Sequence, residues 1–287
     1  HHQGNQSALF GTLAPTSSVK ETYECEFEAI PVDFAYRPER KTPIPRIPGI
    51  MTAKIESASN DEYAYIDKEG NYRIRSAFDL SGNSQGEASS PVRLIQPYSG
   101  ADYGMHFPNH PDAELIWACL DGNVDRPVGL GTVPNPSNAS PSNDQNRPHN
   151  VIRTAAGSEL LMDDTVDKSK ISMQTPDGNK IIFDDDTDKI EIMTTNKHKI
   201  VLDDKNKHIS FQTKEGHAFS LDDKNTKMWF QSKNGHALTL NDKDGSESIT
   251  VGDKSGDNSI TIDISNEKLV INTNNGDIDM HAPNGTI

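Results

Sequence analysis

The hydrophobic pattern is most regular beyond residue 150, where short segments place apolar residues at i and i+2 with polar residues between them. This period of two is typical of a β-strand with one buried and one solvated face. Related stretches begin at Gly178, Lys197, Gly216 and Gly235, each 19 residues after the last. Polar stretches rich in Asp, Lys and Asn separate the segments. The pattern therefore predicts a β-repeat with two strands per unit and spacings of about 19–21 residues.

The predicted core of the array, and its predicted interface between chains, is the set of apolar positions that alternate with polar ones in each strand. The set comprises Leu160, Met162, Ile171, Met173, Ile181, Phe183, Ile190, Ile192, Ile200, Leu202, Ile209, Phe211, Phe219, Leu221, Met228, Phe230, Leu238, Leu240, Ile249, Val251, Ile260, Ile262, Leu269 and Ile271.

Burial of apolar surface stabilises a fold by about 25 cal/mol per Å². So thin a core buries little surface in one chain, so this stabilisation is small beside the loss of backbone entropy on folding. A closed prism needs three walls, and in a lone copy we expect the strand edges to stay open. The pattern favours an intertwined trimeric triple-stranded β-helix, a needle made by three identical chains. A single-chain β-solenoid has a similar period and is the competing interpretation.

The rest of the chain divides by texture. Residues 1–48 are irregular, with one strand-like run over 23–30 and a proline-rich connector over 41–48. Residues 49–133 read as a small barrel, residues 134–150 as a linker without core-forming residues, and residues 151–287 as the needle. The barrel strands are expected over 63–66 and 72–78 (a hairpin), 92–95, 115–120 and 128–133.

Composition narrows the possible functions. The 287 residues are 33 % hydrophobic and 6 % aromatic, and the formal net charge is −15. Nucleic acids and anionic membranes are bound by basic surfaces, so neither is expected as a partner. No apolar run approaches a membrane-spanning length, so no stable membrane anchor is expected. With two cysteines and no signal peptide, the chain is expected to be a fragment of a protein assembled in the cytoplasm.

Candidate chemistry is sparse. The Asp pairs sit on repeated corners rather than across a cleft, and they lack the ligand spacing of known calcium loops. We expect solvated corners neutralised by nearby lysines, and no catalytic residue, cofactor or metal ligand. The lysines are Lys168, Lys189, Lys205, Lys224 and Lys243.

Three histidines share one repeat position, and two interpretations of them stay open. His198, His217 and His236 each precede an inward apolar pair by two residues. In a trimer they could gather imidazoles near the axis as an anion, water or metal site, or they could lean out to solvent. Trp229 is predicted to point outward and Trp117 to lie in a barrel strand.

Several segments together resemble the VgrG spike proteins of type VI secretion systems, relatives of contractile phage tail spikes. The resemblance lies in Glu26-Phe27-Glu28-Ala29-Ile30-Pro31-Val32-Asp33, Tyr36-Arg37-Pro38, Pro45–Gly49, Asp67–Ile74, Val92–Gly100, Gly122–Val128, Ile152-Arg153-Thr154 and Gly157–Leu160. Residues 104–111 lack the usual Arg-Val-Gly run of that family.

This resemblance implies a homotrimer in which the end of a hub domain precedes an OB-fold barrel and a β-helix needle. It implies a structural puncturing role, with an Hcp-like tube protein at the base, a PAAR-type tip protein at the needle end, and effectors carried by either. Secretion to the extracellular space or a target cell would follow. Ile278, Met280, His281 and Ile287 are the expected tip-docking residues. A phage tail spike or receptor-binding trimeric fibre is the alternative.

Overall fold

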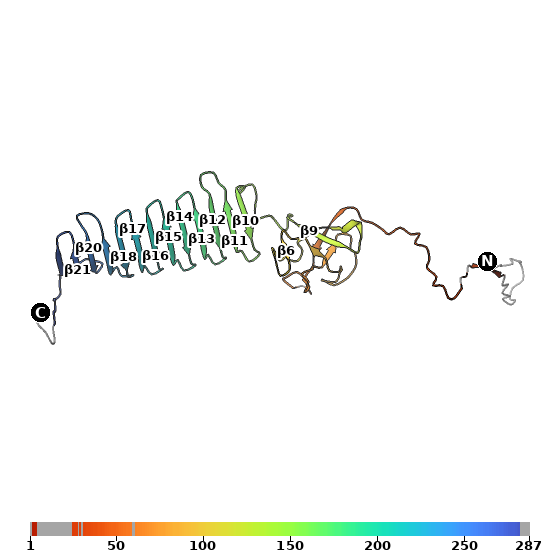
Figure 1. Cartoon of the computed structure of the whole chain (residues 1–287), viewed down its shortest axis with the longest axis horizontal. Helices are drawn as coiled ribbons and strands as arrows, with labels where there is room; N and C mark the ends of the chain where they lie inside the picture. Colours follow the sequence, from red (N-terminus) through yellow and green to blue (C-terminus); the bar gives the residue numbers. More distant parts are fainter. Residues whose placement is uncertain (1, 5–24, 28, 30, 59–60, 282–287) are drawn as a thin grey trace. The chain divides into compact units, whose positions relative to one another are not determined.

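The architecture comes from a computed structural model, which describes residues 2–4, 25–27, 29, 31–58 and 61–281. The chain divides into two compact units, His1–Val133 and Pro134–Ile287 (Figure 1). Within the described residues the only helical element is a short 3-10 turn, η1 (Leu120–Gly122). The all-β prediction is confirmed. In the same residues no helix has the length and apolar character needed to cross a membrane.

The N-terminal unit is built on a five-stranded sheet with the order β4-β3-β8-β9-β5. Neighbouring strands are antiparallel, except that β5 runs parallel to β9. A register shift between Ile116 and Trp117 marks a bulge, and bulges increase local bending. The sheet forms a half-barrel, as expected from the predicted OB-fold. Its strands are β3 (Ile50–Ile55), β4 (Ile74–Ser76), β5 (Arg93–Leu94), β8 (Glu114–Cys119) and β9 (Pro127–Val133).

This half-barrel has a buried core of its own. Alternate residues of β3 and β8 point to one side of the sheet, where Leu115 is 0 % exposed and Ile55 is 2 % exposed. The residues that share this core are Ala53, Ile55, Tyr72, Ile74, Val92, Leu115, Trp117 and Cys119. The N-terminal unit thus removes its apolar residues from water within one chain.

The predicted strands of this unit are found with one important addition. The hairpin expected over residues 63–78 is present as a bridge between Ile66 and Tyr72 followed by β4. The strand β3, which lies between β4 and β8, however, falls outside the predicted strands. Its alternation is weak in the sequence, and its pairing with both β4 and β8 decides its conformation.

Two small sheets complete the described part of this unit. β1 (His2–Gly4) pairs with β2 (Cys25–Phe27), and β6 (Ser99–Gly100) pairs with β7 (Tyr103–Gly104). Only β2 represents the strand predicted over residues 23–30, because residues 23, 24, 28 and 30 lie outside the described residues.

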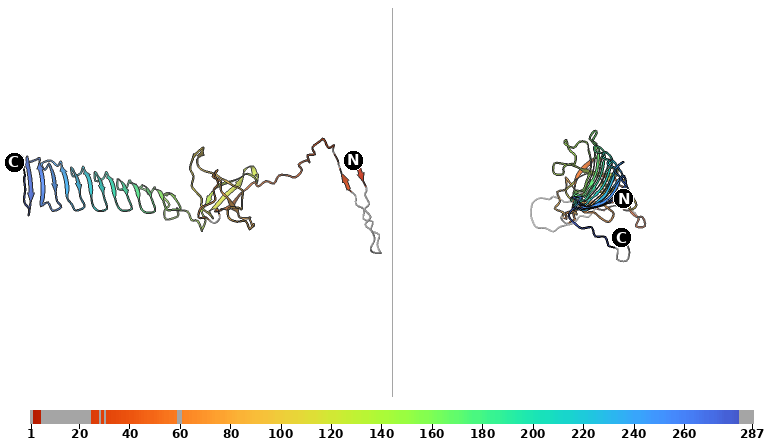
Figure 2. Two further views of the ribbon diagram at one scale, coloured as in Figure 1. Left: turned by 90° about the horizontal axis from the view of Figure 1, so that it is seen from below. Right: turned by 90° about the vertical axis from the view of Figure 1, so that its left-hand side faces the viewer.

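The C-terminal unit is one antiparallel sheet of 13 strands that follow each other in chain order (Figure 2). Each strand pairs with the strand before it and the strand after it in the sequence. The strands are β10 (His149–Arg153), β11 (Glu159–Asp163), β12 (Lys170–Gln174), β13 (Lys180–Asp184), β14 (Lys189–Met193), β15 (Lys199–Asp203), β16 (His208–Gln212), β17 (Ala218–Asp222), β18 (Lys227–Gln231), β19 (Ala237–Asn241), β20 (Ser248–Gly252), β21 (Asn258–Asp263) and β22 (Lys268–Thr273).

Two kinds of turn alternate along this sheet. On one edge, a Thr or Ser carbonyl, or that of Asp253 in the last of these turns, accepts the N–H of the residue three positions later, as in Thr213 to Gly216 at 3.0 Å. That later residue has positive φ, 95° at Gly216 and 90° at Gly235, which glycine adopts without steric cost. The opposite edge carries the aspartate corners. This alternation explains why glycine and Asp-Asp mark the repeat.

The sheet excludes the single-chain solenoid, and the trimer stays a prediction. Coils of a single-chain solenoid would pair as parallel strands, whereas these strands pair with their sequence neighbours as antiparallel hairpins. The expectation that strand edges stay open in one copy is wrong between β10 and β22, because each strand there is paired on both sides. A single-layer sheet of this kind is consistent with a wall of a β-helix needle.

Candidate functional site: the apolar face of the repeat sheet

The predicted core residues of the repeat lie on one face of the sheet in two continuous rows. Residues directly opposite each other on antiparallel strands point to the same face. The glycine-side row consists of Ile152, Leu160, Met173, Ile181, Ile192, Ile200, Phe211, Phe219, Phe230, Leu238, Val251, Ile260 and Ile271. The aspartate-side row consists of Met162, Ile171, Phe183, Ile190, Leu202, Ile209, Leu221, Met228, Leu240, Ile249, Ile262 and Leu269.

Ile152 extends the glycine-side row beyond the predicted set. It pairs with Leu160, so it belongs to the same face. The sequence signal was present as Val-Ile before the first repeat, but no alternating partner follows it within the same strand. Pairing across β10 and β11 supplies the information that the local pattern lacks.

This apolar face is uncovered in the single chain. None of the predicted core residues is buried, and 15 of them are exposed, from 36 % at Ile249 to 66 % at Leu269. Soluble proteins rarely leave a contiguous apolar patch of this size in water, and larger patches mark interaction surfaces. The face is therefore the strongest candidate for a functional surface in the described chain.

The opposite face carries a ladder of alternating charge beside the aspartate corners. Lys170 Nζ lies 2.9 Å from Asp184 Oδ2, and Lys189 Nζ lies 3.2 Å from Asp203 Oδ2. Further along the sheet, the same register position is shared by Asp222 and Lys227. Opposite charges on neighbouring strands stabilise a sheet modestly, and they keep this face hydrated.

The corner carboxylates also hold the turns. Asp203 accepts the backbone N–H of Asn206 at 2.9 Å and a hydrogen bond from its side-chain amide. These two hydrogen bonds, together with the nearby Lys189 ammonium group, lower the Asp203 pKa to about 2. On the glycine-side edge, in the turn between β20 and β21, hydrogen bonds from Asn258 and Ser255 lower the pKa of Asp253 to about 2. The carboxylates act as turn acceptors, which is the role of Asp in an Asx turn.

The corner lysines do not neutralise these acids as predicted. Of the five, only Lys189 takes part in an ion pair within the described residues, and it is a strand residue. The other strand lysine that pairs with a corner acid is Lys170. A strand lysine lies directly opposite the acid of the next strand, whereas a corner lysine extends into water, so register decides which cation pairs.

The three equivalent histidines lie in the glycine-side turns, and all three are exposed. His198 Nδ1 accepts the backbone N–H of Lys214 at 3.4 Å, and His217 Nδ1 accepts that of Lys233 at 3.3 Å. Each of these rings thus connects two successive turns along the edge. The apolar face is itself uncovered in the single chain, and His217 and His236 lie at the rim of a hollow over Phe219, so exposure does not choose between the two interpretations and both stay predictions. Among the described residues, no three His, Cys, Asp or Glu side chains form a cluster able to hold a metal ion.

The two tryptophans have different surroundings. Trp117 lies in the barrel core, 7 % exposed. Trp229 lies on the face opposite the apolar rows, where its ring stacks on His208 with a centroid separation of 6.0 Å. His208 also contacts the Ser220 hydroxyl. Trp229 is half-buried by these neighbours rather than free on the surface.

The expected tip-docking residues follow the last strand, β22. Ile278 and Met280 are 52 % and 61 % exposed, and His281 is also exposed. Ile287 lies outside the described residues. The structure therefore leaves the docking role of this segment a prediction.

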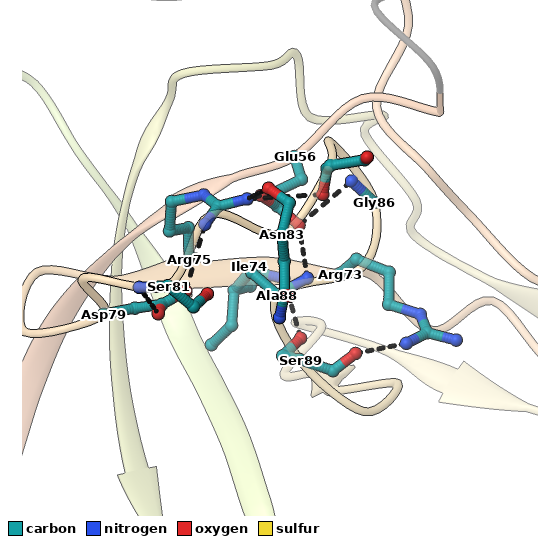
Figure 3. Close-up of polar contacts among 11 residues, drawn as sticks. Glu56, Arg73, Ile74, Arg75, Asp79, Ser81, Asn83, Gly86, Ala88 and Ser89 are labelled. Atoms are coloured by element: carbon teal, nitrogen blue, oxygen red, sulfur yellow. Dashed lines mark hydrogen bonds and ion pairs between the residues drawn. The ribbon is translucent and has the colours of Figure 1, made fainter.

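A buried charge pair in the barrel has no counterpart in the sequence prediction. Glu56, 1 % exposed, lies with Oε1 2.7 Å from Arg75 Nη2, and its Oε2 accepts the N–H groups of Gly86 and Ala88 at 3.0 and 3.2 Å (Figure 3). Arg75 also pairs with Asp79 at 3.0 Å. Arg75 Nη2 also donates to the backbone carbonyl oxygens of Asn83 and Ser84, at 2.9 and 3.3 Å, so the cluster holds the loop after β4 through both N–H and carbonyl groups.

Comparison with characterised proteins bears on what this arrangement does. No family model matches the chain. The type VI secretion system spike protein VgrG1b of Pseudomonas aeruginosa is 28 % identical over 151 residues, 50 % of this chain and 20 % of that protein. Spike protein VgrG2a of the same organism is 24 % identical over 185 residues, 62 % of this chain and 22 % of that protein. The chain is VgrG-like.

A third VgrG-like match extends the comparison to another organism. The actin cross-linking toxin VgrG1 of Vibrio cholerae is 26 % identical over 177 residues, 60 % of this chain and 16 % of that protein. The chain spans about a fifth of the length of these VgrG relatives. The activities of the full-length relatives are therefore not assigned to this chain. The comparisons support the VgrG resemblance inferred from segments within residues 26–160.

Proposed function

We propose that this chain is the barrel-and-needle part of a trimeric spike that a type VI secretion apparatus drives through a target envelope. One observation carries the proposal. The repeat sheet presents an unbroken apolar face that its own chain does not cover, in a protein similar to VgrG spike proteins. Three such sheets with their apolar faces turned inward would enclose a narrow core.

The size of the face supports a second and a third copy as its cover. An apolar residue presents on the order of 200 Å² when fully exposed, so 15 residues exposed by 36–66 % offer more than about 1,000 Å². A stable interface needs roughly 800 Å² from each partner. The total exposed apolar area of the face exceeds this requirement. Identical copies carry the same two apolar rows, so they can cover each other.

The proposed mechanism is mechanical. Backbone hydrogen bonds already close within each chain between consecutive strands, so the shaft gains stiffness from the shared apolar core. The charge ladder on the opposite face would stay in water and discourage lateral aggregation. Such a shaft transmits axial force and needs neither nucleophile nor cofactor, so we propose that this part of the protein is not an enzyme.

The proposed partners follow from the spike role. An Hcp-like tube protein would contact the base and a PAAR-type tip protein the needle end, with effectors attached to either. Cytoplasmic assembly and later secretion belong to the same proposal. The exposed Ile278, Met280 and His281 would meet the tip protein, together with Ile287.

The solution mass of the whole chain tests the trimer. Light scattering coupled to size exclusion should give three times the mass of one chain, with slow dissociation in hot detergent. A stable, folded single copy would refute the proposal. Binding of the trimer to intact cells would instead support the receptor-binding fibre.

Tip docking needs its own test. Truncation after Gly276 should abolish binding of a PAAR-type protein while leaving the trimer intact. Lys268→Ala, an exposed change in β22, serves as the matched control and should leave binding unchanged. Unchanged binding by the truncated chain would refute the docking role.

A further inference from the structure

The glycine-side row is interrupted by three consecutive phenylalanines, here called the aromatic belt: Phe211 in β16, Phe219 in β17 and Phe230 in β18. Phe211 and Phe219 have ring centroids 5.8 Å apart, and Phe219 and Phe230 have centroids 4.5 Å apart, with the rings nearly stacked. Every other member of this row is Ile, Leu, Val or Met, so none of them is aromatic. The belt is therefore the one place where the chemistry of the row changes.

The belt is open toward the uncovered side of the sheet. Phe211 is 42 % exposed and Phe230 is 48 % exposed. A hollow of about 550 Å³ lies over the three rings, with His217 and His236 at its rim. A second hollow, of about 510 Å³, lies over Leu160, Met173 and Ile181 of the same row, so the three rings, and not the hollow, distinguish the glycine-side row at β16–β18.

A uniform repeat leaves the alignment between copies poorly determined. Strands lie about 4.8 Å apart, so a slip of one repeat, two strands, moves one copy by about 10 Å along another. After such a slip, aliphatic residues again meet aliphatic residues, and each charge ladder still alternates. Register is weakly specified wherever the pattern repeats unchanged.

The aromatic belt removes this degeneracy. In aligned copies, rings would meet rings at one level. A slip of one repeat would set the Phe219 and Phe230 rings of one copy against the Ile200 and Phe211 level of another, which overfills one level and underfills its neighbour. Interiors tolerate neither change well.

We propose that the aromatic belt sets the axial register between copies of this chain in the assembled shaft, with the same belt of a second copy as its partner. The inference rests on the proposed trimer. It adds that identical repeats alone do not align the three chains, and that one aromatic level does.

The first test moves the belt by one repeat without changing composition. The variant carries Ile192→Phe, Ile200→Phe, Phe219→Ile and Phe230→Ile, and it keeps Phe211. Alone, it should form trimers as the parent does. When it is refolded together with differently tagged parent chains, native mass spectrometry should find parent-only and variant-only trimers, with mixed trimers reduced at least tenfold below the statistical mixture.

The outcomes separate the two proposals. Monomeric parent chain would refute the trimer itself. A trimeric parent that mixes statistically with the shifted-belt chain would overturn the belt inference and leave the trimer standing. Ile181→Val with Ile260→Val, an aliphatic change in the same row away from the belt, is the control and should mix freely with the parent.

A second measurement covers the case in which the shifted-belt chain fails to fold. Ile260→Cys, in a Cys25→Ser background, places a reporter in the glycine-side row three strands beyond the belt. Aligned copies should form an interchain disulfide in high yield. Replacing all three belt residues with Leu should lower that yield severalfold while the trimer mass is retained, and an unchanged yield would overturn the inference.

Discussion

The barrel and the repeat sheet handle their apolar residues in opposite ways. The half-barrel buries Leu115, Ile55 and their neighbours to a few per cent exposure within one chain. The repeat sheet has more apolar residues in regular order, yet none of its predicted core residues is buried. Regular alternation produces a face, whereas burial needs a second layer. A β-structure can thus be locally well specified and still leave its apolar face uncovered.

The largest effect is expected from a charge introduced on the apolar face, which tests whether that face is buried between copies. Val251→Asp places a carboxylate at a position that is 53 % exposed in one copy but enclosed in the proposed trimer. Burying an unpaired charge costs at least about 3 kcal/mol per chain, so the trimer should be lost. Light scattering would show single chains or aggregates.

The matched control for Val251 is its neighbour on the opposite face. Thr250→Asp changes the adjacent residue, which contacts the Thr261 hydroxyl at 3.1 Å on the hydrated side. We expect the trimer to persist in this variant. If both variants were trimeric, the apolar face would not be the interface.

A cavity in the barrel should have the second largest effect and should stay within that unit. Leu115→Ala should cost about 2–5 kcal/mol of barrel stability, because Leu115 is 0 % exposed and its neighbours cannot collapse fully. Trp117 fluorescence should report earlier unfolding of the barrel, with the trimer mass unchanged. Ile116→Ala, on the other side of β8, should have a smaller effect. Loss of the trimer would show that the two units are not independent.

Weakening the buried Glu56–Arg75 pair should have an intermediate effect. Glu56→Gln removes the charge that holds Arg75 and the N–H groups of Gly86 and Ala88, at a cost of about 1–3 kcal/mol. Limited proteolysis should cut the loop after β4 faster than in the parent. Glu87→Gln, an exposed change in the same loop, should leave the rate unchanged.

Acid should have the smallest effect, and it should act on turns of the repeat sheet. Asp203 and Asp253 have a folded pKa of about 2, below the value of 3.8 for an unperturbed Asp. Their contribution to stability is therefore complete above about pH 4 and is lost as the pH falls toward 2. Acid titration of the repeat's unfolding midpoint should show this decline, and Asp203→Asn should flatten part of it. An equal decline in that variant would exclude Asp203 as a source.

The predicted interface residues and the predicted partners remain predictions. The positions of the interface residues in the sheet nevertheless show which features the sequence pattern records. The period of two correctly grouped the predicted core residues, the set that runs from Leu160 to Ile271, on one face of the sheet. Strand alternation is a local property, so the sequence records it. The ion-pair partners of Lys189 and Glu56, Asp203 and Arg75, could not be predicted from the sequence pattern. Both depend on which strand or loop lies across the sheet, and sequence spacing does not record that.

The sequence by itself determined the strands of the repeat, their apolar and hydrated faces, and the two kinds of turn, since each follows from side-chain alternation or from glycine and aspartate at fixed positions. Only the tertiary structure decided that consecutive hairpins form one layer rather than a coil, that β3 lies between β4 and β8 in the barrel sheet, and that Glu56 is buried against Arg75. These features depend on contacts between residues distant in sequence or on which of several equivalent strand edges pair, and local preference leaves those choices open.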